Sequence, residues 1–210
     1  ERRKPITRYI IMLSNLKDLS DFLKQRHYSK IFILVDEHTE MYCLPLFVTE
    51  VEEIFDSCLL EVFCGEKSKC FTVVEDLCKT LVEENADRDS VIISLGGGVL
   101  SDIGGFVASI FKRGIQNINV PTTLLAMVDA SIGGKTGINL NNIKNQIGTF
   151  NFSSPAFYDY RFLSSLPKRQ VLNGAAEMIK IALIKDENLW NSMKKESPYD
   201  SKQGFDSSFI

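Results

Sequence analysis

One segment of this sequence, residues 30–35, is a continuous apolar run that leads into Asp36, and it constrains the fold more than any other feature. A strand that is apolar on both faces belongs in a parallel sheet with helices on either side. Similar strands are expected at residues 59–63, 90–95 and 115–120. The segments between them have helical character, and together they give the alternation of strand and helix that is typical of an α/β fold.

The other elements complete this pattern. We expect a strand at residues 7–13 and helices at residues 16–26, 45–55, 67–84, 99–112 and 167–185. Residues 140–152 are rich in asparagine and have no clear period, so a loop over the site is expected there. The last helix begins at a proline, and we place a domain boundary before it. Residues 1–166 then form an α/β domain, and residues 167–210 begin a second, helical one. Because that helix buries only part of its surface against the first domain, we expect an N-terminal part of a longer protein.

The composition excludes several classes of partner. With 24% charged residues and a net charge of −3, the 210-residue chain gives no sign of a nucleic-acid or anionic-membrane partner. No apolar run reaches the roughly 18 residues of a membrane span, and no signal peptide is visible. The five cysteines are odd in number and contain no C-x-x-C pair. We therefore expect small buried cysteines in a cytoplasmic protein.

Two glycine-rich runs carry the first hint of function. Residues 96–102 follow a predicted strand and open a helix, which is the setting of a dinucleotide turn, although Ser101 replaces the third glycine of G-x-G-x-x-G. The run therefore fits either phosphate binding or a tight turn without a ligand. Asp102 is expected in the first helical turn, where it could also act as a cap. Residues 133–136 are not a P-loop, because Asp129 stands where that motif needs glycine.

Glu177 and Lys180 are a second candidate for chemistry. They are three residues apart and so share one face of the predicted last helix. They form either a helix ion pair or a metal ligand beside a substrate-binding lysine. Catalytic zinc usually has three protein ligands. The two histidines, His27 and His38, lie far upstream and are expected at the surface and in a solvated loop.

Taken together, eight stretches resemble 3-dehydroquinate synthase in order and spacing over nearly the whole chain. They are residues 65–69 (GEKSK), 96–102 (GGGVLSD), 113–114 (RG), 120–126 (VPTTLLA), 128–137 (VDASIGGKTG), 144–145 (KN), and 163–167 (LSSLP) with 174–180 (GAAEMIK). A set of this length is far more specific than any single glycine motif.

The resemblance implies an α/β, Rossmann-like NAD-binding domain with a parallel sheet, followed by the start of an α-helical metal-binding domain. It implies the conversion of 3-deoxy-D-arabino-heptulosonate 7-phosphate into 3-dehydroquinate and phosphate, with transiently reduced NAD and Zn²⁺ or Co²⁺, in a protein that is commonly a homodimer. Three other readings stay open: another sugar-phosphate cyclase, a metal-dependent polyol dehydrogenase, and a non-catalytic dinucleotide-binding module.

The resemblance also assigns residues by position. The implied cofactor contacts are Asp36, Glu66, Lys69, Gly97, Gly98, Val99, Leu100, Ser101, Asp102, Thr122, Thr123, Lys135, Lys144, Phe162, Leu163, Ser164 and Ser165. The implied catalytic and substrate contacts are Arg113, Asp129, Lys135, Asn145 and Lys180. Glu177 is the implied metal ligand, and the other ligands are expected outside this chain. Two departures stand out: Ser101 replaces a glycine that is common in the family, and the paired histidine ligands are absent.

Overall fold

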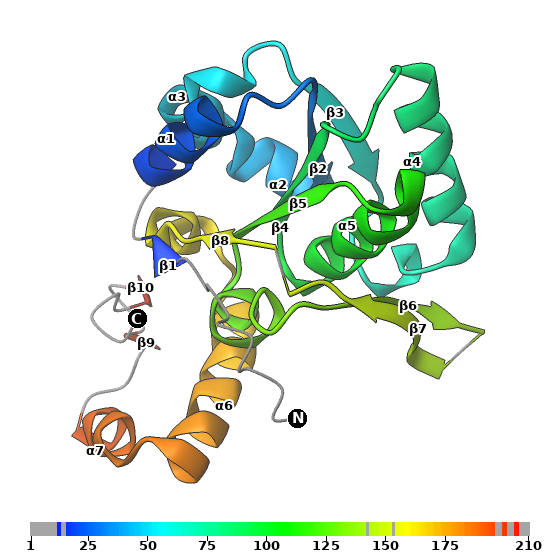
Figure 1. Ribbon diagram of the computed structural model, residues 1–210. Coiled ribbons are helices and arrows are strands. Elements are labelled where there is room, and N and C mark those ends of the chain that lie inside the picture. The colour runs from blue at the N-terminus through cyan, green and yellow to red at the C-terminus, as the bar shows by residue number, and fades with distance from the viewer. Residues whose placement is uncertain are drawn as a thin grey trace, which may run out of the picture.

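A six-stranded parallel sheet lies at the centre of the computed structural model, which describes residues 12–13, 16–141, 143–152, 154–195, 199–200 and 204–205 (Figure 1). Its strand order is β1-β8-β5-β4-β2-β3. The strands are β1 (Met12–Leu13), β2 (Ile31–Asp36), β3 (Cys58–Val62), β4 (Val91–Gly96), β5 (Gln116–Pro121) and β8 (Ala156–Phe157). All neighbouring pairs are parallel, so the predicted α/β fold with a parallel sheet is confirmed.

Helices cover both faces of this sheet. The α-helices are α1 (Leu16–Arg26), α2 (Glu37–Tyr42), α3 (Leu44–Glu50), α4 (Phe71–Glu83), α5 (Gly98–Ile110), α6 (Lys168–Lys185) and α7 (Glu187–Lys195). Shorter turns of helix are η1 (Glu52–Ile54), η2 (Glu66–Ser68), η3 (Phe111–Arg113), η4 (Ala126–Ala130) and η5 (Tyr160–Ser165), of which η4 is a π-helix. None of the described helices is both long and apolar enough to cross a membrane.

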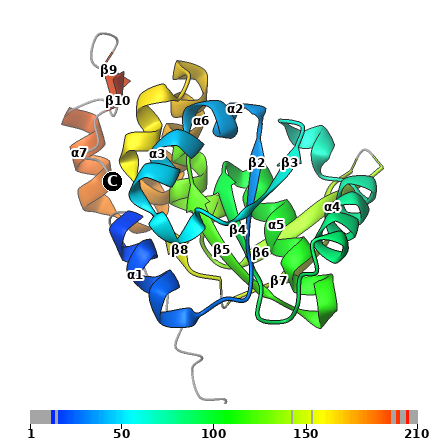
Figure 2. The ribbon, with the colours of Figure 1, turned by 90° about the horizontal axis from the view of Figure 1, so that it is seen from above.

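Strand β2 shows why the sheet is buried on both sides. Phe32 and Leu34 point into one apolar cluster with α4 and α5, while Ile33 and Val35 point into another with α1 and α3. This is the two-residue period of an extended strand. Seen from above, α1 and α3 lie on one side of the sheet and α4 and α5 on the other (Figure 2).

Several predicted boundaries are corrected by the structure. The helix expected at residues 45–55 is interrupted at Val51, whose backbone is extended. The helix expected at residues 67–84 begins only at Phe71, after η2. Helix α2 was not predicted; a reciprocal capping box between Asp36 and Thr39 begins it. Of the strand expected at residues 7–13, residues 7–11 lie outside the described part of the chain.

The loop expected at residues 140–152 is mostly an antiparallel hairpin. Strands β6 (Lys135–Leu140) and β7 (Ile143–Phe150) pair with each other, and β6 packs along α5. Two glycines face each other in this ladder, and a Cβ at Gly148 would lie 2.0 Å from the carbonyl oxygen of Thr136. The glycines and asparagines hide the period of the strands, which is why the sequence pattern was misread as a loop.

The cysteines agree only in part with the expectation of burial. Cys43 is buried, and burial raises the pKa of its thiol to about 11. Cys64, by contrast, is exposed, and the other three cysteines are half-buried. All five are free thiols, as the odd count suggested.

Helix α6 packs against the π-helix η4 and, through a glycine, against the residues just before it. A Cβ added at Gly174 would lie 2.5 Å from the Cβ and Cγ atoms of Leu124, so only glycine permits this approach. Val171 and Met178 extend the same contact, and Leu189 of α7 adds to it. The start of α6 coincides with the expected domain boundary, which itself stays a prediction.

We expect Gly174→Leu to lower the free energy of unfolding by about 1–3 kcal/mol, because overpacking forces α6 away from η4. Ala176→Leu is the matched control: Ala176 is exposed on the same helix, and the change there should stay within about 0.5 kcal/mol. Urea unfolding of both variants measures the difference. Equal losses in the two variants would contradict the tight packing of α6 at Gly174.

Candidate functional site

The carboxyl ends of the parallel strands bring most of the predicted cofactor residues to one edge of the sheet. Asp36 ends β2, the turn at Gly97 follows β4, and Thr122 follows β5. Glu66 and Lys69 follow β3, and residues 162–165 follow β8. In open α/β sheets, ligands bind in the crevice outside this edge. Residues that are far apart in the sequence therefore meet where a dinucleotide would be expected.

The turn after β4 is shaped by glycine. A Cβ at Gly97 would lie 3.1 Å from Cγ2 of Thr123, and a Cβ at Gly98 would lie 3.0 Å from that of Ala130. The segment after β5 can therefore lie close over the start of α5, and the backbone N–H of Thr122 donates to the carbonyl of Gly96 at 3.0 Å. No side chain caps α5 at Gly97, so the helix start offers backbone donors to an anion.

Some of the predicted cofactor contacts have side chains that are buried or already hydrogen-bonded within the protein. Leu100, Phe162 and Leu163 are buried in the apolar clusters, and Ser101 is buried as well. Ser164 and Ser165 each donate a hydroxyl hydrogen bond to a backbone carbonyl within η5. The carboxylate of Asp36 caps α2 through Oδ1. At this edge of the sheet, a cofactor would therefore meet the backbone groups of these residues more readily than their side chains.

Lys69 joins the turn after β3 to α5 and to the hairpin. Its Nζ lies 2.5 Å from Oδ2 of Asp102 and 2.5 Å from Oδ1 of Asn145, and 3.9 Å from Oε1 of Glu66. The residue is only 3% exposed, so the charge is buried among these partners. This contact corrects the expectation for Asp102: it lies beyond the first turn of α5, does not cap the helix, and pairs with Lys69.

Burial and charge act in opposite directions on the two carboxylates of this cluster. Burial raises the pKa of Asp102, and the nearby ammonium of Lys69 offsets only part of that effect. For Glu66, burial also raises the pKa, but a hydrogen bond from Asn139 together with Lys69 and Lys144 outweighs it, so the pKa lies below its usual range. Nζ of Lys144 lies 3.6 Å from Oε2 of Glu66.

A cavity of about 410 Å³ lies beside this cluster. Asp102, Asp129, Lys135 and Asn145 all line it, on the side where the hairpin faces α5 and η4. Lys135 Nζ lies 3.7 Å from Oδ1 of Asp129, and both side chains are largely accessible. Four residues that the sequence assigned to cofactor or substrate therefore surround one polar space.

Helix α6 carries two further predicted residues and lies beside η4, the turn that contains Asp129. Glu177 and Lys180 form an ion pair, which is one of the two readings their spacing allowed. The pKa of Lys180 is raised mainly by the hydrogen bond to Glu177, and the charge of Asp129 adds to the effect. Among the described residues, no group of three or more His, Cys, Asp or Glu side chains could hold a metal ion. His38 lies exposed on α2 rather than in the expected loop.

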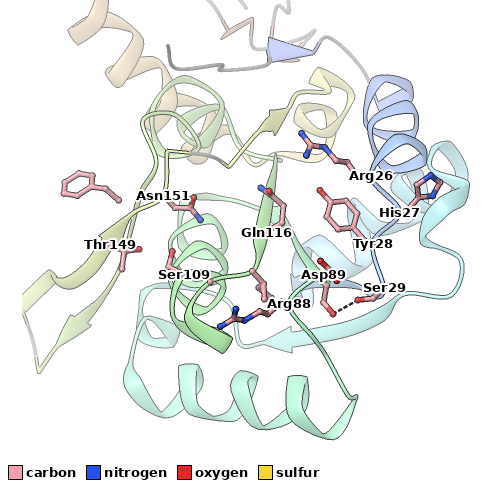
Figure 3. Close-up of a pocket in the computed structure, with 14 residues that line it drawn as sticks. Arg26, His27, Tyr28, Ser29, Arg88, Asp89, Ser109, Gln116, Thr149 and Asn151 are labelled. Atoms are coloured by element: carbon pink, nitrogen blue, oxygen red, sulfur yellow. Dashed lines mark hydrogen bonds between the residues drawn. The ribbon is translucent and has the colours of Figure 1, made fainter. Parts of the chain in front are cut away.

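Arg113 is the exception among the predicted substrate contacts. It ends η3, between the end of α5 and the start of β5, and so lies at the amino edge of the sheet. A larger cavity of about 790 Å³ opens at that edge, and Figure 3 shows Arg26, Arg88, Ser109 and Asn151 around it. No predicted catalytic, cofactor or metal residue lines it. The structure thus separates Arg113 from the cavity that holds Asp129.

Asn139 is a site residue that the sequence reasoning missed. It contacts Glu66 and Asn145, but it lies within β6, next to the segment that was expected to be a loop. An asparagine at the start of such an asparagine-rich segment is ordinarily read as a turn residue. Only the pairing of β6 with β7 would have placed it in the cluster.

Solved structures of related enzymes share this architecture. One is 2-epi-5-epi-valiolone synthase from Streptomyces hygroscopicus subsp. jinggangensis 5008 with NAD⁺ and Zn²⁺ bound; it is 27% identical with a TM-score of 0.81, over 97% of this chain and 57% of that one. Another is 2-deoxy-scyllo-inosose synthase complexed with carbaglucose-6-phosphate, NAD⁺ and Co²⁺; it is 28% identical with a TM-score of 0.73, over 80% of this chain and 47% of that one.

The sequence comparisons identify the family. The 3-dehydroquinate synthase of Parabacteroides distasonis is 43% identical over 176 residues, which are 83% of this chain and 50% of that protein. The chain spans about half the length of the curated relatives that it matches. The family described as 3-dehydroquinate synthase N-terminal matches residues 59–173, more than half of the chain. The chain therefore belongs to the 3-dehydroquinate synthase family and corresponds to the N-terminal part of its members.

Proposed function

We propose that this chain is the NAD-binding part of a 3-dehydroquinate synthase, a phosphate lyase that converts 3-deoxy-D-arabino-heptulosonate 7-phosphate into 3-dehydroquinate and phosphate. The observation that carries the proposal is that one polar cavity is lined by Asp102, Asp129, Lys135 and Asn145 together. It lies beside the carboxyl edge of a parallel sheet, and the chain belongs to the family that catalyses this reaction.

In this proposal the residues in and around the cavity have different tasks. The start of α5 at Gly98 and the hydroxyl of Thr123 suit the pyrophosphate and ribose of NAD, because they offer hydrogen-bond donors. The ammonium groups of Lys135 and Lys180 suit the phosphate and carboxylate of the substrate. Asp129 and Asn145 can accept or donate hydrogen bonds to its hydroxyl groups.

Two bound groups complete the proposal. NAD would supply transient oxidation of a ring hydroxyl, and a divalent metal, zinc or cobalt, would supply Lewis-acid polarisation. Glu177 fits as one carboxylate ligand, since it is half-buried on α6, the helix that contacts the turn carrying Asp129. One ligand cannot hold a catalytic metal. The other ligands are therefore expected outside this chain, in the remainder of a two-domain protein that acts as a cytoplasmic homodimer.

The decisive experiment measures phosphate release and NADH together. With the complete protein, NAD and a divalent metal, we expect phosphate release from the heptulosonate phosphate without net NADH. Release only from another sugar phosphate would identify a different cyclase. Accumulation of NADH with a polyol would identify a dehydrogenase. The 210-residue chain alone should bind NAD weakly and turn over nothing; turnover by this chain with zinc would contradict the assignment of the missing ligands.

A further inference from the structure

Asn139, which no predicted site includes, holds together two parts of the cluster. It is half-buried near the end of β6. Its backbone N–H donates to the carbonyl of Lys69 at 2.9 Å, which ties the hairpin to the turn after β3. Strands β6 and β7 form a two-stranded sheet of their own, which extends beside α5 in Figure 1. The hairpin therefore depends on contacts of this kind to keep its position relative to the sheet.

The two ends of the Asn139 carboxamide serve different partners. Nδ2 donates to Oε1 of Glu66 at 2.9 Å and to the Glu66 carbonyl at 3.4 Å. Oδ1 accepts from the backbone N–H of Asn145 at 2.9 Å. A carboxamide can donate at one end and accept at the other, whereas a carboxylate can only accept. The side chain is thus matched to both neighbours at once.

Asn145 needs this support. Its φ is +54°, in the left-handed region that non-glycine residues seldom adopt. Asn139 holds its backbone N–H and Lys69 donates to its side-chain Oδ1. The direction in which the Asn145 carboxamide enters the cavity is therefore set by two residues that lie outside the hairpin turn.

We propose that Asn139 is a positioning residue that orients Glu66 toward the cofactor and Asn145 toward the substrate at the same time, so that binding of the two is coupled through one carboxamide. This inference rests on the proposed function, because Glu66 and Asn145 are the assigned cofactor and substrate contacts. Asn139 itself need touch neither ligand.

In the complete protein, Asn139→Asp tests the contact with Glu66 separately from the contact with Asn145. The aspartate keeps an acceptor for the N–H of Asn145, but it loses the donor to Glu66 and places a second carboxylate beside it. NAD binding, measured by calorimetry, should weaken by about tenfold or more, as expected when a hydrogen bond to a charged group is lost. At saturating NAD, kcat/KM for the heptulosonate phosphate should change by less than about threefold.

Asn139→Ala removes the side-chain contacts with both Glu66 and Asn145, so NAD affinity and kcat/KM should both fall. If Asn139 acts through Asn145, its effect on kcat/KM should largely disappear when Asn145 is already alanine. Asn141→Gly is the matched control: it removes an exposed carboxamide two residues away, and glycine tolerates the φ of +52° at that position. That control should leave both quantities within about twofold of the wild type.

The outcomes separate this inference from the proposed function. A wild-type protein that binds no NAD and releases no phosphate would overturn both. A fully active wild type with unchanged NAD affinity in Asn139→Asp would overturn only the role of Asn139. Equal losses in the Asn139→Asp and Asn139→Ala variants, or full additivity with Asn145→Ala, would show that Asn139 merely stabilises the hairpin.

Discussion

Replacing Lys69 with methionine is expected to lower the free energy of unfolding by about 3–5 kcal/mol, the usual cost of removing one partner of a buried ion pair. Methionine fills a similar volume, so the loss comes from charge rather than from packing. Asp102 would keep a carboxylate in a partly buried place without the ammonium that lies 2.5 Å away. Urea unfolding at neutral pH measures this effect.

The pH dependence of the same variant gives a sharper test. Asp102 already has a raised pKa, and removing Lys69 would raise that pKa further, because only the weaker effect of the Lys135 charge would then oppose burial. A group whose pKa is raised on folding favours the folded state at low pH, where it is protonated, and loses that contribution as the pH rises through its folded-state pKa. The stability difference between Lys69→Met and wild type should therefore narrow as the pH falls.

Lys67→Met is the matched control for both measurements. Lys67 lies in the same short turn but is exposed, so the change there should stay within about 0.5 kcal/mol at every pH. A Lys69 variant as stable as the Lys67 variant at neutral pH would contradict the buried pair with Asp102. If the stability difference between Lys69→Met and wild type widened toward low pH, the ionised Asp102 carboxylate would not be the source of the loss.

Lys135→Ala is expected to lower kcat/KM of the complete enzyme by about a hundredfold or more, close to 3 kcal/mol of transition-state stabilisation. The proposed partner of Lys135 is the substrate's phosphate, and a contact between ammonium and phosphate is among the stronger hydrogen bonds. Its effect on folding should be small, because the Lys135–Asp129 pair is largely exposed. Steady-state phosphate release and urea unfolding measure the two effects separately.

Lys79→Ala serves as the control for Lys135. Its side chain is 58% exposed, against 62% for Lys135, and it also forms an ion pair, with Glu75 on α4. Removing it deletes an exposed charged pair away from the cavity, so kcat/KM should not change. If Lys135→Ala behaved in the same way, Lys135 would no longer belong to the proposed site.

The sheet and its helices could largely be read from the sequence because their signals are local. The apolar run at residues 30–35 indicated a strand covered on both faces, and β2 is buried in this way. Helix α1 begins and ends where its pattern predicted, and α6 begins one residue after Pro167. The family could be recognised in the same way, since its motifs are continuous stretches of sequence.

The sequence alone thus determined the fold class, the family and the identity of most candidate residues, because periodic apolar spacing and contiguous motifs do not depend on distant contacts. The tertiary structure decided which candidates share a cavity. It placed Arg113 at the opposite edge, turned a presumed loop into the β6–β7 hairpin, and joined Asn139 to Glu66 across 73 residues. Such contacts depend on how strands and helices pack, and a hydrogen bond between two distant polar side chains leaves no pattern in the residues around either one.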